Sequence, residues 1–276
     1  MKLKVIGSSG AHPFPKPGCT CADCKKAQRI GIPYERISSA LFIQPDILID
    51  TPEEIFRRLI QFNILQLNHV FYTHWHPDHT QGMRLFETWV FSGFIGKKNR
   101  DPINVYMPVD MIADFDRFLP SFRGHFEPAK FINIVNIEDR TPVPLGSVTV
   151  TPLNLRRHDR VRYAFLIEEK GKKAIYAPCS IFGTQFDEFW NDIDLLFIET
   201  GWPGNTAKLR KENIAESLED HISLEENFDF IAQVKPRKTI LTHLEGGYHI
   251  TYDQIKEIAK AHPKVDVAYD GLEIEL

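Results

Sequence analysis

The stretch FYTHWHPDHTQG, residues 71–82, crowds four side chains of metal-ligand type into six positions: His74, His76, Asp78 and His79. The apolar segment HVFYT at 69–73 has the composition of a buried strand, so these side chains are expected on the loop that leaves its carboxyl end. In extended backbone, residues two apart face the same way. This predicts that His74 and His76 bind one ion together, while Asp78 and His79 turn toward a neighbouring ion. Imidazole and carboxylate ligands suit zinc, iron or manganese.

Length and composition bound the class of protein. The chain has 276 residues, 43% of them apolar, which is enough to bury a sizeable core. With 33 basic and 37 acidic residues, the net charge of -4 excludes a global electrostatic attraction to nucleic acid or to an anionic membrane. The sequence has no run of about 18 apolar residues and no apolar segment of signal-peptide length. No membrane association is therefore expected, and a cytoplasmic location is predicted.

Strand-like and helix-like segments alternate along the whole chain, and no long Gly/Ser linker divides it. The pattern predicts a single α/β domain over residues 1–276, with two sheets inside and helices outside. Segments rich in Val, Ile, Phe and Tyr predict strands at 3–7, 41–44, 47–50, 69–73, 103–107, 131–137, 148–155, 163–177, 194–200, 238–243 and 265–276. Helices are predicted at 51–64, 109–119, 223–235 and 251–262. The first helix is expected to have Thr51 as its N-cap and Pro52 in its first turn.

The HxHxDH pattern of residues 74–79 resembles the signature of the metallo-β-lactamase superfamily. Within that superfamily, the sequence is most similar to the branch that contains the cyclic-phosphate phosphodiesterase of phosphonate breakdown and the pyrroloquinoline quinone biosynthesis protein B. The resemblance spans nearly the whole chain. It implies an αββα four-layer sandwich and a metal-dependent hydrolase, and it leaves the substrate open because the signature is shared across the superfamily.

The resemblance also implies ligands from strand ends further along the chain. His158 matches the third histidine of the first metal, and His243, at the end of KTILTH, matches the last histidine of the second. The family usually has an aspartate that bridges both metals, but the matching segment YAPCS has Cys179. A thiolate is an acceptable zinc ligand, and a small buried core cysteine is the alternative. Both a dinuclear and a single-metal site therefore stay open.

The cluster GCTCADC, residues 18–24, matches the CxCxxC with which that branch holds a structural zinc. Thiolates of Cys19, Cys21 and Cys24 would supply three of the four tetrahedral ligands. The resemblance implies His249 as the fourth ligand, with His12 as its competitor. Reduced thiols without a metal are the alternative.

These residues lead to the hypothesis of a phosphodiesterase that acts on a small phosphodiester, including a cyclic one. A metal-activated hydroxide would attack the substrate, with Asp78 orienting it. His221 matches a histidine that serves the leaving group in this branch and would act as general acid. A purely structural turn is its alternative, because Ser223 and Glu226 form a capping-box pattern just after it. Two catalytic zinc ions, or manganese or iron in their place, are expected besides the structural zinc.

Other functions stay open on the sequence. The same ligands suit a hydrolase of thioesters or lactones, or a cofactor-biosynthesis enzyme like the quinone protein of this branch. A binding protein without turnover is disfavoured, because a structural role does not require an open coordination position. Arginines at 156, 157, 160 and 162 would hold a phosphate or carboxylate near the metals, and the alternative is that alternating strand geometry sends half of them to solvent. A small anionic substrate is expected, and nucleic acid is not an expected partner. The aromatic segment 84–130 packs in the core, walls the pocket or forms a homodimer interface.

Overall fold

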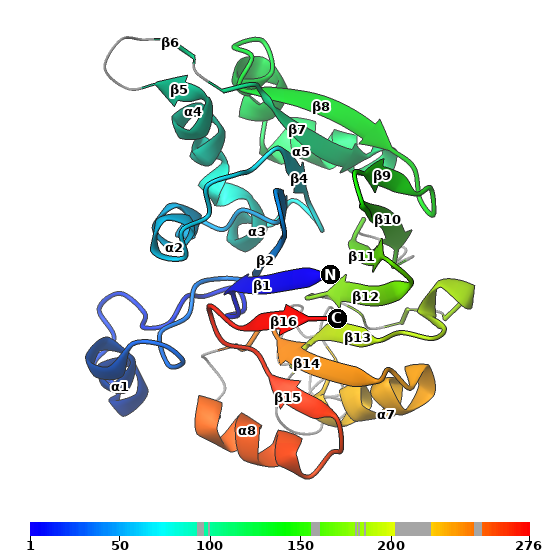
Figure 1. The fold of residues 1–276 in the computed structure, drawn as a ribbon. Helices are drawn as coiled ribbons and strands as arrows, with labels where there is room; N and C mark the ends of the chain where they lie inside the picture. The colour runs from blue at the N-terminus through cyan, green and yellow to red at the C-terminus, as the bar shows by residue number, and fades with distance from the viewer. Residues whose placement is uncertain are drawn as a thin grey trace.

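Two seven-stranded sheets lie face to face in the computed structural model of the chain (Figure 1). The structure describes residues 1–92, 97–98, 100–155, 161–179, 181, 183–184, 186–201, 222–245 and 250–276. In spatial order, the first sheet contains β16 (Glu273–Glu275), β1 (Lys2–Gly7), β2 (Ala40–Ile43), β3 (Ile47–Ile49), β4 (His69–Phe71), β7 (Ile103–Pro108) and β8 (Ile132–Ile137). The second contains β15 (Val265–Val267), β14 (Lys238–Thr242), β13 (Leu195–Glu199), β12 (Lys172–Ala177), β11 (Tyr163–Glu169), β10 (Val148–Asn154) and β9 (Val143–Leu145). A short ladder joins β5 (Phe91–Ser92) to β6 (Lys97–Lys98).

Each sheet is antiparallel on one side and parallel on the other. In the first sheet, neighbours from β16 to β3 pair antiparallel and neighbours from β3 to β8 pair parallel. In the second, neighbours from β9 to β12 pair antiparallel and neighbours from β12 to β15 pair parallel. Parallel neighbours end at the same edge of a sheet. The segments that follow β12, β13 and β14 therefore leave the second sheet side by side.

Large apolar side chains fill the space between the sheets. Phe71 of β4 meets Phe165 of β11 edge to face, with ring centroids 5.4 Å apart, and stacks on Tyr106 of β7 at 4.4 Å. Phe71 and Phe165 are fully buried. Burying a side chain of this size stabilises the fold by about 1.5–3 kcal/mol. This packing fixes the strands whose ends carry the polar residues described below.

Helices cover the outer faces of the two sheets (Figure 1). On the first sheet lie α2 (Ile55–Gln61), α3 (Pro77–Thr80), α4 (Leu85–Val90) and α5 (Ile112–Phe118), and on the second lie α7 (Leu224–Val234) and α8 (Tyr252–Lys260). Shorter helical turns are η1 (Gln81–Arg84), η3 (Val109–Met111), η4 (Phe122–Phe126) and η5 (Glu188–Trp190). This arrangement confirms the predicted αββα sandwich. Among the described residues, no helix combines the length and the apolar character needed to cross a bilayer.

The predicted helix starts are confirmed in the second half of the chain and wrong near the beginning. Ser223 caps α7 and Thr251 caps α8, each within a capping box. The helix expected from Thr51 begins instead at Ile55. The Thr51 hydroxyl is 2.8 Å from the Tyr72 hydroxyl, so it serves the core rather than the helix end.

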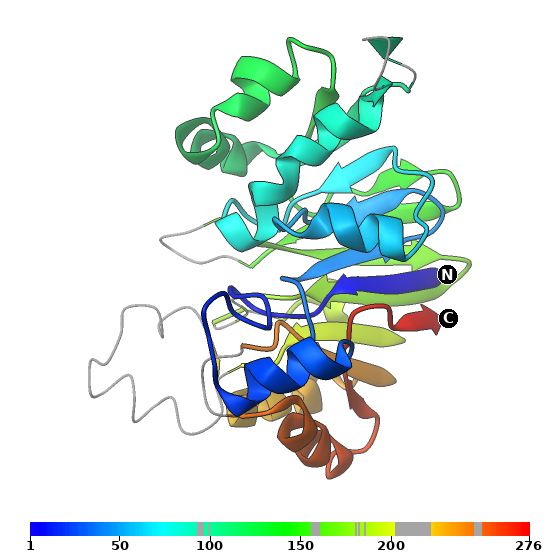
Figure 2. The ribbon, with the colours of Figure 1, turned by 90° about the vertical axis from the view of Figure 1, so that its left-hand side faces the viewer.

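One further helix, α1 (Ala22–Ile30), lies in a region for which the sequence pattern predicts none. Cys21 is its N-cap, and the Cys21 sulfur accepts a hydrogen bond from the backbone N–H of Cys24. Figure 2 shows α1 beside α8. Lys26 of α1 pairs with Asp253 of α8 at 2.6 Å, so the helix ties the first residues of the chain to its last helix.

Candidate metal centre

Two groups of potential metal ligands lie next to each other and share one histidine. Donor atoms of His74, His79 and Cys179 lie within 4.8 Å of one another, and so do donor atoms of Asp78, His79 and His243. All of these side chains are buried or nearly so. Each group has the size and donor types of a zinc site, and the shared His79 makes the two groups contiguous.

The sandwich brings these residues together from the ends of three strands. His74 follows β4, and α3 carries Asp78 and His79 with Pro77 at its first position. Cys179 follows β12 in the opposite sheet. His243 follows β14. The backbone N–H of Tyr163, at the start of β11, donates to the Thr73 carbonyl at 2.9 Å and so holds the loop of the first sheet against the second.

Asp50 orients His79 from behind. The carboxylate Oδ2 of Asp50, at the end of β3, lies 2.7 Å from His79 Nδ1, and both side chains are fully buried. Burial acts to lower the pKa of His79, but Asp78 and Asp50 outweigh it and raise that pKa well above its usual value. With Nδ1 engaged by Asp50, the Nε2 atom of His79 is directed toward the two ligand groups.

In His74, too, one ring nitrogen has a hydrogen-bond partner and the other faces the ligand group. Its Nδ1 lies 3.0 Å from the Thr73 hydroxyl, and its buried Nε2 has no hydrogen-bond partner among the described residues. Burial, with His79 close by, holds the pKa of His74 well below its usual value. A neutral imidazole with a buried lone pair is the form that binds a metal, so the donor set fits a metal ion.

Cys179 belongs to the group of His74 and His79, is buried, and also interacts with His243 of the other group. Burial acts to raise the pKa of its thiol, but the imidazoles of His243 and His79 outweigh it and lower the pKa to about 5. Arg162, itself buried, adds to this effect with its Nη1 3.7 Å from the sulfur. A thiolate is the form in which cysteine binds metals.

Asp78 lies on the other side of His79. Its Oδ2 is 3.1 Å from His79 Nε2 and 3.6 Å from His243 Nε2. Burial acts to raise the pKa of Asp78, but the two histidines outweigh it and hold that pKa well below its usual value. The group therefore presents an ionised carboxylate.

Other predicted residues lie elsewhere or outside the described part of the chain. His76 belongs to neither ligand group, although its ring centroid is 4.6 Å from that of His74. The pairing of His74 and His76 on one ion stays a prediction, and the donor atoms that gather with that of His74 belong to His79 and Cys179. His158, His221 and His249 lie outside the described residues, as do the arginines at 156, 157 and 160.

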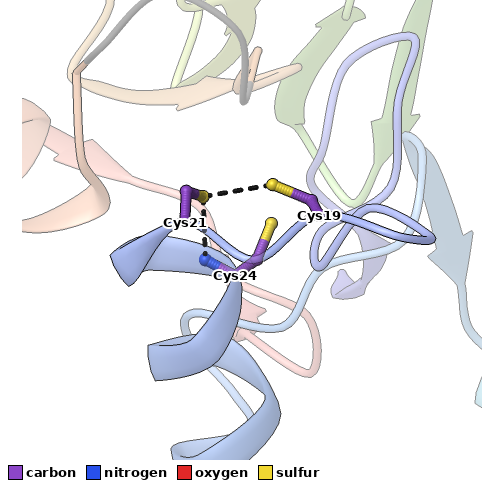
Figure 3. Close-up of side chains that lie close together, drawn as sticks. All are labelled: Cys19, Cys21 and Cys24. Carbon is purple, nitrogen blue, oxygen red and sulfur yellow. Dashed lines mark hydrogen bonds between the residues drawn. The ribbon is translucent and has the colours of Figure 1, made fainter.

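The cysteine cluster forms a separate group. Figure 3 shows the sulfur atoms of Cys19, Cys21 and Cys24 turned toward one another at the start of α1. Cys19 and Cys21 are 3.3 Å apart at their sulfurs. Burial raises the pKa of the Cys24 thiol to about 11. The cluster lines a cavity of about 230 Å³, to which Ile250 and Thr251, on the C-terminal side of 246–249, also contribute.

His12, the competitor for the fourth position of this cluster, faces another residue. It is 68% exposed, and its Nδ1 lies 4.0 Å from Glu245 Oε2. It is not among the residues whose donor atoms gather with the cysteines.

Sequence reasoning missed two buried carboxylates beside the centre. Asp50 directly follows β3, and Glu199 is the last residue of β13, which lies between the strands that precede Cys179 and His243. Glu199 is fully buried, and its Oε1 accepts a hydrogen bond from Ile181 N at 2.8 Å. The signal for both is an acidic residue that closes an apolar strand, in ILID and FIE.

Comparison with known proteins identifies one matching family model and several structures of similar fold. A family model described as the beta-lactamase superfamily domain matches residues 46–244. A crystal structure of a diphosphatase from the PhnP family is similar with a TM-score of 0.75 at 18% identity, covering 100% of this chain and 97% of the other. Zinc-bound PqqB from Methylobacterium extorquens is similar with a TM-score of 0.73 at 17% identity, covering 100% of both chains. At these identities the likeness concerns the fold.

One curated relative is similar in sequence. An octanoyltransferase from Porphyromonas gingivalis is 25% identical over 279 residues, which covers 99% of this chain. The chain spans about half the length of this relative, 51%.

Proposed function

The chain belongs to the beta-lactamase superfamily, whose fold is that of metal-dependent hydrolases, and we propose that it hydrolyses a small anionic phosphodiester, including a cyclic one. The observation that carries the proposal is the sharing of His79 by two adjacent ligand groups, each with buried donor atoms. Two metals a few ångströms apart can clamp the attacking and leaving oxygens of a phosphoryl group. Packing alone does not explain why so many ionisable groups are buried here.

The proposed ligands divide between two metals. His74 and Cys179 would hold the first metal, together with His76 and His158, and Asp78 and His243 would hold the second. His79 would complete the second site, with Cys179 reaching toward both. Zinc suits this mixture of imidazole, thiolate and carboxylate, and the structural neighbour PqqB is zinc-bound. Manganese or iron would serve at the same donors.

The metals would supply a water of lowered pKa and a Lewis acid for the phosphoryl oxygen. Side chains of the protein would orient the ligands and the nucleophile and supply charge and protons. Asp50 fixes the ring of His79, the ionised carboxylate of Asp78 accepts a proton or orients the nucleophile, and Arg162 adds positive charge beside Cys179. His221 would deliver the proton to the leaving alkoxide.

A phosphodiester is favoured over a neutral substrate by charge. Two divalent ions with open coordination positions and the buried guanidinium of Arg162 would offer direct binding partners for the charged oxygens of an anion. A structural neighbour in the PhnP family is a diphosphatase, which supports the same substrate class. The cysteine cluster would hold a structural zinc, with His249 as its fourth ligand.

The test is metal analysis of the purified full chain followed by a substrate panel. Protein loaded with zinc or manganese is assayed on bis(p-nitrophenyl) phosphate, cyclic nucleotides, other cyclic phosphodiesters, thioesters and lactones. Turnover of phosphodiesters that requires His74 and Asp78 supports the proposal. Turnover confined to thioesters or lactones would overturn it.

A second candidate is hydrolysis of an acyl thioester. The observation that favours it is the curated relative named an octanoyltransferase, since medium-chain acyl groups are commonly carried as thioesters. An octanoyl thioester in the same panel separates the two candidates. Faster turnover of that substrate than of any phosphodiester would make the second candidate the better one.

A further inference from the structure

His243 holds its position on a backbone conformation that a histidine rarely adopts. Its φ of 54° lies in the left-handed region, which costs a residue with a side chain about 1 kcal/mol or more. Backbone hydrogen bonds fix the chain on both sides of His243. Leu244 N donates to Ser8 O at 2.9 Å, and Thr200 N donates to Thr242 O at 2.7 Å. Residues 8–11 therefore hold the backbone next to His243 in place.

Glu245 links the side chain of His243 to residues 8–11. Its Oε1 accepts a hydrogen bond from Ala11 N at 2.6 Å and lies 3.8 Å from His243 Nδ1. Only 12% of the Glu245 side chain is exposed. The carboxylate thus occupies a fixed place between the backbone of the first loop and the ring of His243.

Gly10 leaves the room that this carboxylate needs. A Cβ added to Gly10 would lie 2.1 Å from Glu245 Oε1 and 2.3 Å from its Cδ, closer than any real contact allows. Gly10 N also donates to Leu244 O at 3.2 Å, so the two segments pack backbone to backbone. The missing side chain at position 10 and the buried carboxylate are complementary.

We propose that Glu245 is a positioning residue for His243. Glu245 is held in the space beside Gly10, and it fixes the orientation of the His243 imidazole toward the second metal of the centre. The inference rests on the proposed function, because it takes His243 as a ligand. Glu245 touches the ligand and not the reacting atoms, so its effect passes through the affinity and geometry of that metal. Residues that orient a metal-bound histidine typically change metal affinity about 10- to 100-fold.

The test measures zinc bound to the full chain at a series of buffered free zinc concentrations. Glu245→Ala and Gly10→Ala are each expected to weaken one zinc site by about 10- to 100-fold. Glu245→Gln keeps an acceptor for Ala11 N and is expected to retain near-native affinity at that site. Gly124→Ala is the matched control, because a Cβ at Gly124 meets nothing within 4 Å.

Rescue by glutamine distinguishes positioning from a general effect on stability. If Glu245→Ala binds zinc as the unaltered chain does, or if glutamine fails to rescue, the inference is overturned. His243→Ala separates this failure from a failure of the proposed function. Loss of one zinc in His243→Ala with none lost in Glu245→Ala overturns only the role of Glu245. No zinc lost in His243→Ala overturns the metal assignment on which it rests.

Discussion

Asp50 Oδ2 lies 2.7 Å from His79 Nδ1 at the point where β3 and the HxHxDH loop meet. The same carboxylate accepts hydrogen bonds from the backbone N–H and the hydroxyl of Thr73. One buried side chain therefore fixes both the ring of His79 and the start of the loop that carries every ligand of the HxHxDH segment. It acts at the one histidine that the two ligand groups share.

Replacing this carboxylate should weaken metal binding without unfolding the chain. Asn at position 50 keeps an acceptor for Thr73 and tolerates the left-handed backbone there, where φ is 65°. Because the charge that holds His79 is lost, Asp50→Asn should lower metal affinity about 10- to 100-fold. Zinc competition with a chelator measures this. Asp46→Asn, just before the other end of β3, is the control, and an equal effect there would refute the specific role.

The ligands themselves should matter more than residues behind them. His74→Ala and Asp78→Ala should each reduce hydrolysis by more than about 100-fold, the upper value expected for a residue that only orients a ligand, because a direct ligand of a catalytic metal is lost. The chain should stay folded, which circular dichroism and thermal unfolding check. Turnover at the level of the unaltered protein in either variant would show that the centre lies elsewhere.

Cys179 allows a test of how sulfur replaces a carboxylate. Cys179→Ser should weaken metal binding at the centre, because a neutral hydroxyl donates less charge to zinc than a thiolate does. Cys179→Asp should shift preference toward harder ions such as manganese and preserve or raise phosphodiesterase activity. Metal content and turnover with each ion are the measurements. Unchanged metal content in Cys179→Ser would make Cys179 a core residue and favour a single-metal site.

The cysteine cluster should bind zinc independently of the catalytic centre. Cys21→Ser should remove one zinc per chain and lower the melting temperature, since a structural metal contributes its binding free energy to folding. Activity should fall only as far as stability does. Elemental analysis of the purified variant decides the matter, and a zinc count equal to that of the unaltered chain would contradict it.

Metal binding at this cluster should depend on pH through Cys24. Burial raises the pKa of its thiol to about 11, so at pH 7 the metal-free site holds a proton that zinc must displace. The metal-free state binds more protons than the zinc-bound state, and affinity should therefore rise with pH between about 7 and 9, by about tenfold per unit for each proton released. Calorimetry in buffers of different ionisation enthalpy counts these protons. Zinc uptake without proton release would contradict it.

Much of the fold follows from local pattern. The runs ILID, HVFYT and KTILTH form strands in the structure, because short apolar runs closed by polar residues suit a sheet covered on both faces. Start signals based on Ser223 and Thr251 also hold, since a capping box is satisfied within one turn. Thr51 carries the same local signal, but a contact with Tyr72, distant in sequence, takes its hydroxyl away.

The candidate site also contains some residues that the sequence predicts and others that only the structure reveals. The spacing within the HxHxDH segment predicts His74, Asp78 and His79 as ligands, and the resemblance to the superfamily adds Cys179 and His243. Asp50 has no neighbouring ligand in the sequence, so only the register of β3 beside β4 reveals its contact with His79. The grouping of His74 with Cys179 similarly depends on how one sheet faces the other, which periodicity does not encode.

The mixed pairing of the two sheets has an evolutionary consequence. Among the described residues, the ligand-bearing segments follow strands of the parallel halves, while the tight hairpin between β11 and β12 belongs to an antiparallel half. Insertions and substitutions in the connections beyond the ligands leave the sheet ladders intact, so descendants of one ancestral gene can diverge in substrate while inheriting the same metal cradle.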